Sequence, residues 1–471
     1  MVLPAHGKHR ATPSTDLADN FIIAPSTTST TNDTTTKPNN GWPATDPQYR
    51  YGLRAIHYGH GRLAILDQDR LPFSAELVPI ENVPDACAAI NSMAVRGAPA
   101  IAIVAALSIA IQLQQWSMAM VYERDAGATA AAAAETFRTH LRTVPALCRD
   151  LRATRPTAVN LANAMAELEV LAADPCLEDE GPATETASLK VMARVVVRAE
   201  AMLAEDVRDN RRIGEFGRDC ILARMHFPEF DPKVRVLTHC NTGALATAGY
   251  GTALGIVRAL AAHTQGQLEC FFTESRPRFQ GARLTAMELV YERIPCRMVA
   301  DSAAAALLAS AKGTVHAVVV GADRITREGA VANKIGTLGL AVLARHFGVP
   351  FIVAATTATI DLMSSAEDVR IEERDAQEMM AVRGPVLGEV KVVEGQQYER
   401  EAVVSAKQKG DQPLTLTCNP RVSVWNPAFD ITPPGLIDVI VTEAGAFERP
   451  FGALGFNMEA IVKAAAAAKK R

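Results

Sequence analysis

The sequence predicts an α/β protein: a mainly helical N-terminal domain with a small β element, then a C-terminal doubly wound (Rossmann-like) parallel-sheet domain. In the C-terminal half, short runs rich in β-branched residues alternate with helical stretches, which is typical of right-handed βαβ units. In the N-terminal half, alanine-rich helical stretches dominate. The 471 residues are 48% hydrophobic and 21% charged, the composition of an ordinary soluble globular protein.

Residues 1–45 are rich in Thr, Ser, Asn and Pro, as in S-T-T-S-T-T-N-D-T-T-T-K-P-N-N. Such a segment buries too little apolar area to offset the entropy lost on ordering, so we expect a disordered tail. A phosphorylated regulatory arm is the alternative interpretation of the same composition.

The predicted N-terminal domain covers residues 46–225. Its first element is R-A-I-H-Y-G-H-G-R-L-A-I-L-D, in which two short apolar runs flank a glycine-containing turn, so we expect a β-hairpin. Helical segments are expected from Val83 to about Ser117, with Asn82 as the N-cap, and alanine-rich helices then continue to about Arg224.

The predicted C-terminal domain covers residues 226–471. Six β-like runs follow one another with helices between most of them: V-R-V-L-T-H-C, L-E-C-F-F-T-E, C-R-M-V-A-D, H-A-V-V-V-G-A-D, P-F-I-V-A-A-T-T and I-D-V-I-V-T-E. Between the fifth and sixth runs lies a polar, weakly periodic stretch. Residues of about 380–424 are therefore expected to form a surface insertion that is poorly ordered in part.

Charge and cysteine usage exclude several classes of partner. The net charge is −4, from 48 basic and 52 acidic residues, so we expect no nucleic-acid partner. The eight cysteines show no CxxC spacing and no His cluster accompanies them, so we expect no metal site and reduced thiols in the cytosol. No secretory signal is evident, and the longest apolar run, Pro99–Ile111, is too short to cross a bilayer. That run is predicted to be a buried helix, and no membrane contact is expected.

Open α/β sheets bind ligands outside the carboxyl ends of their strands, and here polar residues gather at those ends. Cys240 follows the first run and is predicted to lie at or near a helix N-terminus, where the helix dipole favours a thiolate. A small buried residue is the alternative. Asp323 follows the apolar V-V-V-G-A-D run, where desolvation would raise its pKa and suit it to acid–base chemistry. A helix-capping role is the alternative for this aspartate.

The glycines after Cys240 do not form a dinucleotide-binding loop. Gly249, Gly251 and Gly255 have the spacing G-x-G-x-x-x-G rather than G-x-G-x-x-G, and they are predicted to lie inside a helix. There, Gly251 and Gly255 would allow close helix packing. His239 alternates with Cys240 along the run, so we expect it to point the other way and to be structural.

Several stretches contain side chains that are candidates to bind an anion or a sugar hydroxyl. V-R-G-A-P-A-I places Arg96 and Gly97 before a helix with Pro99 in its first turn, and A-T-R-P-T-A-V-N-L places Arg155 similarly. Further candidates for phosphate or sugar contacts are Asn333 and Lys334, expected to lead into a helix near its start, and Arg276 and Gln280 in the donor-rich S-R-P-R-F-Q-G. Surface ion pairs and helix caps are the alternatives for these side chains.

Together these stretches resemble the methylthioribose-1-phosphate isomerase family, from about Leu53 to the C-terminus. The motifs, in order, are V-R-G-A-P-A-I, T-R-P-T-A-V-N-L, T-H-C-N-T-G-A-L-A-T, R-P-R-F-Q-G-A-R-L-T-A-M-E-L, G-A-D-R-I, A-N-K-I-G-T and N-P-A-F-D-I-T-P-P. Ser275 and Met287 stand where the family commonly has Thr and Trp.

The resemblance implies a homodimeric aldose–ketose isomerase of methionine salvage. It would convert 5-methylthioribose 1-phosphate into 5-methylthioribulose 1-phosphate without a metal or nucleotide cofactor, in the cytoplasm and also the nucleus. It implies that Cys240 and Asp323 are catalytic. The implied substrate contacts are Arg96, Gly97, Ala98, Arg155, Gln280, Asn333 and Lys334.

Two other functions remain open from the sequence. The alpha, beta and delta subunits of translation initiation factor 2B share this architecture as regulatory proteins, but they generally lack the Cys/Asp pair within these motifs. A ribose-1,5-bisphosphate isomerase would share the chemistry but needs a second group of cationic side chains to bind its second phosphate. The sequence also leaves open whether hydrogen moves as a hydride or through an enolate.

Overall fold

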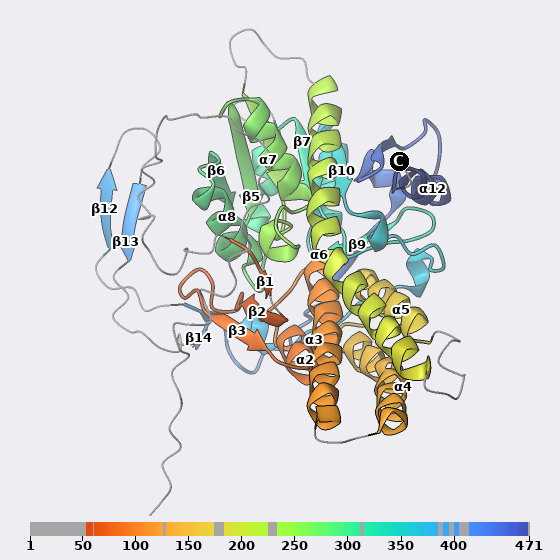
Figure 1. Ribbon diagram of the computed structural model, residues 1–471. Coiled ribbons are helices and arrows are strands. Elements are labelled where there is room, and N and C mark those ends of the chain that lie inside the picture. The colour runs from red at the N-terminus through yellow and green to blue at the C-terminus, as the bar shows by residue number, and fades with distance from the viewer. Residues whose placement is uncertain are drawn as a thin grey trace, which may run out of the picture.

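A computed structural model describes residues 53–469, apart from 60, 126–128, 174–182, 225–232, 311–314, 385–389, 395–399 and 405–413. The predicted tail, residues 1–45, lies outside the described residues, as does much of the predicted insertion. The described chain forms a helical N-terminal region with a three-stranded sheet, and a C-terminal region around a seven-stranded, mostly parallel sheet (Figure 1). The predicted fold class is confirmed.

The N-terminal β element is a three-stranded antiparallel sheet. Strands β1 (Ile56–Gly59) and β2 (Arg62–Leu66) pair with Ile56 opposite Ile65, which confirms the predicted hairpin. A third strand, β3 (Leu77–Ile80), pairs with β2 and was not predicted. Only the last residue of β3 is fully buried, so the strand carries little of the apolar alternation that identifies a strand in a sequence.

Five helices follow: α2 (Val83–Asn91), α3 (Ala98–Asp125), α4 (Ala130–Thr154), α5 (Val159–Ala172) and α6 (Ala183–Ala223). The predicted cap is confirmed, because the Asn82 side chain accepts a hydrogen bond from the Asp85 backbone N–H at 2.9 Å. A break at residues 92–97 separates α2 from α3 and brings the chain to the functional site.

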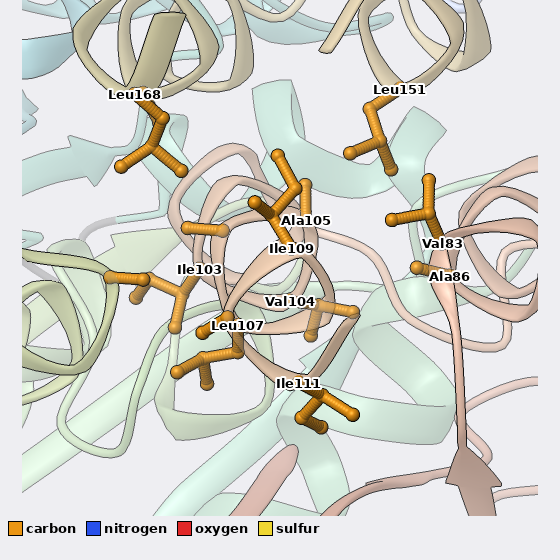
Figure 2. Packing of buried hydrophobic residues seen from close by; sticks show 14 of the residues in the cluster. Val83, Ala86, Ile103, Val104, Ala105, Leu107, Ile109, Ile111, Leu151 and Leu168 are labelled. Atoms are coloured by element: carbon orange, nitrogen blue, oxygen red, sulfur yellow. The ribbon is translucent and has the colours of Figure 1, made fainter. Parts of the chain in front are cut away.

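The first half of helix α3, to Ile111, is apolar on all sides and lies at the centre of the N-terminal core. Neighbouring helices contribute side chains to the same core, labelled in Figure 2: Val83 of α2, Leu151 of α4 and Leu168 of α5. By length and composition alone, Ala98–Ala119 is long enough to cross a membrane, so the prediction that this apolar stretch is too short was wrong. Because 78% of its most apolar window is buried inside the protein, α3 is a core helix, and the buried-helix prediction is confirmed.

Helix α6 extends over 41 residues and packs against both regions of the molecule (Figure 1). Its first half contributes Val191, Val195 and Ala199 to the N-terminal core. Its second half contributes Ile213 and Ile221 to the core beneath the large sheet. One continuous helix therefore fixes how the two regions sit against each other.

The large sheet contains β4 (Val234–Thr238), β5 (Leu268–Thr273), β6 (Cys296–Val299), β7 (Ala317–Val320), β10 (Phe351–Ala354), β16 (Val439–Thr442) and β17 (Gly445–Glu448). Their spatial order is β6-β5-β4-β7-β10-β16-β17. The first six in the chain are parallel, as predicted, while β17 is an antiparallel edge strand that was not predicted. The order reverses between β4 and β7, which makes the sheet doubly wound.

Helices cover both faces of this sheet. Alternate strand residues point to opposite sides, so that Val319 packs with α6, α7 (Ala253–His263) and α8 (Ala286–Tyr291). Its neighbour Val318 packs on the other face with α9 (Ala304–Ala309), α10 (Thr337–Phe347) and α12 (Met458–Lys469). Burial on both faces explains why these strands read as continuous apolar runs.

Smaller elements complete the C-terminal region. Strands β8 (Arg324–Ile325), β9 (Val331–Lys334) and β15 (Phe429–Thr432) form a separate sheet beside the carboxyl edge of β7. Around the predicted insertion, the described residues form α11 (Gln377–Met380) and two antiparallel pairs: β11 (Ala381–Arg383) with β14 (Leu414–Leu416), and β12 (Val390–Glu394) with β13 (Arg400–Val404).

Candidate active site

A pocket lies at the carboxyl edge of the large sheet, where the strand order reverses. Cys240 follows β4 and Asp323 follows β7, and both residues line this pocket. It encloses about 610 Å³, counting its opening to solvent. The crevice at such a reversal point is where doubly wound sheets bind ligands.

The structure brings all nine predicted site residues to this one pocket. They come from the turn before α3, the turn before α5, the ends of β4 and β7, the loop after β5 and the end of β9: Arg96, Gly97, Ala98, Arg155, Cys240, Gln280, Asp323, Asn333 and Lys334. The N-terminal region supplies both arginines, and the C-terminal region supplies the thiol and the carboxyl group. Their catalytic and binding roles remain predictions.

The local structure at Cys240 differs from the prediction. Cys240 does not lie at a helix N-terminus, because only a short 3-10 turn at Ala244–Ala246 follows it and α7 begins at Ala253. Its backbone is in the left-handed region, with φ +66°, which is uncommon for a residue other than glycine. The side chain is 7% exposed, and Sγ lies 3.6 Å from Oε1 of Gln280.

The glycine prediction is wrong for two of the three residues. Gly249 and Gly251 lie in the loop before α7, with φ values of +158° and +90°. A Cβ on Gly251 would lie 2.5 Å from Cα of Gly243, so this loop folds closely onto the loop that carries Cys240. Gly255 does lie in α7, and a Cβ there would lie 3.4 Å from the Asn210 carbonyl oxygen of α6, which is a close helix contact as predicted.

The prediction that His239 is structural is confirmed. Its side chain is 2% exposed and does not line the pocket. Its Nδ1 hydrogen-bonds with Oγ1 of Thr273 at 2.5 Å, and its Nε2 with the Ile335 carbonyl oxygen at 2.9 Å. Burial lowers the pKa of His239, which favours the neutral ring.

Asp323 lies between β7 and β8, with no helix following it directly, so the helix-capping alternative does not apply. Its backbone N–H donates to the Ala332 carbonyl oxygen at 3.0 Å, which ties the residue to β9. Burial raises the pKa of its carboxyl group, while Lys334, Arg155 and Arg96 oppose that rise. The group thus holds its proton to higher pH than an exposed aspartate.

The cationic residues around the pocket are buried rather than paired on the surface. Arg96 is 5% exposed, and its guanidinium donates to the carbonyl oxygen of Asn241 at 3.0 Å and to the Asn241 side-chain oxygen. The Arg96 Nε is buried and has no hydrogen-bond partner among the described residues. Arg155 is 9% exposed, and its Nε lies 3.4 Å from the Glu372 carboxylate.

Asn333 and Lys334 lie on β9, just before α10 begins at Thr337, so the prediction that they lead into a helix is confirmed, although the strand itself was not predicted. They occupy this strand because they pair with Asp430 and Phe429 of β15. The Lys334 ammonium donates to the Ala428 carbonyl oxygen at 3.0 Å and lies 4.6 Å from the centre of the Phe429 ring. Burial lowers its pKa, and the nearby Cys240 and Asp323 oppose that effect.

Arg276 does not contribute to the pocket, although the sequence suggested it. Its guanidinium donates to the Met379 carbonyl oxygen at 2.7 Å and packs over the Phe279 ring, outside the pocket lining. Gln280, four residues later, does line the pocket. Among the described residues, no group of three or more His, Cys, Asp or Glu side chains is placed to hold a metal ion.

A buried glutamate beneath the pocket was missed by sequence reasoning. Glu288 is fully buried, accepts hydrogen bonds from Asn241 Nδ2 and the Ala244 backbone N–H, each at 2.7 Å, and pairs with Arg258. Asn241 in turn accepts from Arg96, so Glu288 supports the arginine indirectly. A charge in the middle of a helical stretch is usually exposed, so no sequence pattern pointed to this role.

Gly97 lies close to the backbone of the C-terminal region. Its φ is +97°, and a Cβ there would lie 2.3 Å from the Ala246 carbonyl oxygen. Replacing Gly97 with Ala is expected to lower the free energy of unfolding by about 1–3 kcal/mol and to raise KM, because the turn carrying Arg96 must move. Gly348→Ala is the matched control: its φ is +68° but nothing lies within 4 Å, so KM should not change. Denaturant titration and steady-state kinetics measure both effects; an unchanged KM in Gly97→Ala would contradict this prediction.

Comparison with known proteins decides the family. The profile of the initiation factor 2 subunit family matches residues 94–449. The methylthioribose-1-phosphate isomerase of Paracoccidioides brasiliensis (strain Pb18) is 45% identical over 401 residues, which cover 84% of this chain and 96% of that protein. The chain belongs to the methylthioribose-1-phosphate isomerase family. A second family member, from Aspergillus terreus (strain NIH 2624 / FGSC A1156), is 44% identical over 86% of this chain and 99% of its own length.

Solved structures agree with this assignment. The 5-methylthioribose 1-phosphate isomerase of Pyrococcus horikoshii OT3 has a TM-score of 0.62 and 30% identity, covering 88% of this chain and 96% of its own. A structure described as subunit delta of translation initiation factor eIF-2B from A. fulgidus has a TM-score of 0.60 and 33% identity, covering 85% and 97%. The isomerase family thus shares its fold with a protein described as a translation factor subunit, and a shared fold does not imply a shared activity.

Proposed function

We propose that this protein is an aldose–ketose isomerase that converts 5-methylthioribose 1-phosphate into 5-methylthioribulose 1-phosphate in methionine salvage. The observation that carries the proposal is one buried pocket that contains a thiol, a carboxyl group of raised pKa and three cationic side chains. The enzyme names of the fungal relatives, which match over most of their length, support the same substrate.

The cationic side chains suit a sugar phosphate. Arg96, Arg155 and Lys334 all line the pocket, and their positive charges favour an anion that is withdrawn from water. The backbone N–H groups of Gly97 and Ala98 lie at the start of α3, where a helix dipole adds to this attraction. Gln280 and Asn333 offer amide groups for the sugar hydroxyls.

The reaction requires ring opening and then a hydrogen transfer. The phosphate on C1 prevents the sugar from opening as a free aldehyde, so the ring oxygen must be protonated as the ring opens. Asp323 supplies that proton, because its raised pKa keeps it protonated to higher pH. Hydrogen then moves from C2 to C1, either as a hydride or through an enolate with Cys240 as the base. Incorporation of deuterium at C1 in D₂O would distinguish the two routes.

A direct assay tests the proposal. The purified protein is incubated with 5-methylthioribose 1-phosphate, and ketose formation is followed by NMR; ribose 1,5-bisphosphate serves as the competing substrate. We expect turnover with the methylthio substrate and much less with the bisphosphate. No turnover with either would favour a regulatory protein, and preference for the bisphosphate would favour the alternative isomerase.

We also propose that the protein is a homodimer that works in the cytoplasm and the nucleus. The resemblance set out above supports this proposal. Light scattering after size-exclusion chromatography measures the oligomeric state, and imaging of a tagged chain locates the protein. A monomeric mass at working concentrations would contradict the dimer.

Deletion of residues 1–45 is expected to leave kcat and KM within about twofold of the full-length values, since a polar tail of this composition contributes no core. Every predicted site residue lies beyond this segment. Steady-state kinetics of the truncated and complete chains make the comparison. A large loss of kcat would show that the segment takes part in catalysis or assembly.

A further inference from the structure

The backbone of Cys240 is held by two hydroxyl groups that do not line the pocket. The Cys240 N–H donates to Oγ of Ser275 at 2.8 Å, and the Oγ1 hydroxyl of Thr285 donates to the Cys240 carbonyl oxygen at 2.6 Å. Both hydroxyl-bearing residues are 0% exposed. Each polar backbone group of this one residue is therefore fixed by a separate side chain from a different part of the chain.

This arrangement coincides with the uncommon backbone of Cys240. With φ +66°, the residue is in a conformation that costs free energy for any L-residue and persists only where its surroundings hold it. In an extended conformation, as in the preceding strand, the Cα–Cβ bond would point in another direction. The left-handed turn is thus what directs Sγ into the pocket, where it meets Gln280.

Both hydroxyls are themselves anchored. The Ser275 backbone N–H donates to the Asp301 carboxylate at 2.8 Å, and its Oγ lies 3.2 Å from Oγ1 of Thr273. Thr285 belongs to the π-helical turn Gly281–Thr285, which leads directly into α8. Because both partners are fixed by the sheet edge and by a helix, they constrain Cys240 rather than follow it.

We propose that Ser275 and Thr285 are positioning residues that hold the Cys240 backbone in its left-handed turn and so aim its thiol at the substrate. The expected change in kcat rests on the proposed isomerase function. The geometric part of the proposal stands on the hydrogen bonds alone. Neither residue lines the substrate pocket, so each acts on the reaction through a neighbouring residue, which in this proposal is Cys240.

The test compares Thr285→Val, which keeps the shape and loses the hydroxyl, with Thr285→Ser, which keeps the hydroxyl. Ser275→Ala removes the other hydroxyl. We expect Thr285→Val and Ser275→Ala to lower kcat by about 10- to 100-fold with KM within about threefold, since small displacements of a reacting group have effects of this size. Thr285→Ser should stay within about threefold of the unaltered protein.

A second readout is the rate at which iodoacetamide alkylates Cys240 in the folded protein, located by peptide mass spectrometry. It should change by about tenfold or more in Thr285→Val and Ser275→Ala but not in Thr285→Ser, because the thiol takes up a new position. This measurement needs no turnover, so it remains valid if the proposed reaction is wrong.

Three outcomes would overturn the proposal. The first is an unchanged kcat and alkylation rate in Thr285→Val and Ser275→Ala. The second is a rise in KM alone, which would place the effect at Arg96, since the Asn241 amide lies 3.4 Å from Thr285 Oγ1 and Asn241 supports that arginine. The third is an equal loss in Thr285→Ser and Thr285→Val, which would mean that packing rather than the hydroxyl matters. Thermal unfolding checks that each variant is folded. If Ser275→Ala is unfolded, the comparison of Thr285→Val with Thr285→Ser carries the test.

Discussion

Replacing Asp323 with Asn is expected to lower kcat by at least about 10²-fold, the low end of general acid–base effects. The amide keeps the shape of the side chain but carries no acidic proton for the ring oxygen. The matched control is Asp361→Asn, which alters a carboxylate that follows β10 and pairs with Arg324 outside the pocket. Steady-state kinetics of both variants test the role. A rate for Asp323→Asn near that of the unaltered protein would remove this residue from the mechanism.

The proposed role of Asp323 also predicts the direction in which kcat/KM changes with pH. Burial raises the pKa of Asp323, so the proton is present at low pH and is lost as the pH rises through that raised pKa. If Asp323 donates the proton, kcat/KM should fall on the alkaline side of that pKa, and Asp323→Asn should lack this limb. Activity that instead rose as Asp323 lost its proton would assign it the role of a base.

Replacing Cys240 with Ser is also expected to lower kcat by at least about 10²-fold. Serine preserves the size of the side chain and the left-handed turn, but its hydroxyl is far less acidic and less polarisable than a thiol. The control is Cys87→Ser on α2, a half-buried cysteine remote from the pocket. Kinetics and alkylation mapping compare the two variants. An equal loss in both would point to stability rather than chemistry.

Most of the fold could be predicted because its signals are local. Strands buried on both faces, such as β7, read as uninterrupted apolar runs, and the helices between them fix the parallel topology. Two of the strands that were missed, β3 and β17, are short and largely unburied, so their sequences resemble loops. Their place in a sheet depends on the neighbouring strand and not on their own pattern.

The membership of the pocket could also be predicted, because strand ends and helix entries are visible in the sequence. The conformation of the site could not. The φ angle of Cys240 depends on Ser275, which is 35 residues away, and on Thr285, which is 45 residues away. Likewise, Lys334 lies on a strand because Phe429 of β15 pairs with it, and its ammonium donates to the Ala428 carbonyl oxygen, 94 residues further along the chain. Such long-range hydrogen bonds leave no periodic trace in the sequence.

Helix α6 has a consequence for how this protein tolerates insertions. Its early residues belong to the core beside Arg96 and Arg155, and from Ile213 onward it belongs to the core beneath Cys240 and Asp323. One extra residue between 207 and 213 would turn everything beyond it by about 100° about the helix axis. The arginines and the thiol would then no longer face one another. An insertion in a surface loop leaves the pocket intact. An insertion within α6 rotates one half of the pocket relative to the other, so the number of residues in this part of the helix is constrained by the active site.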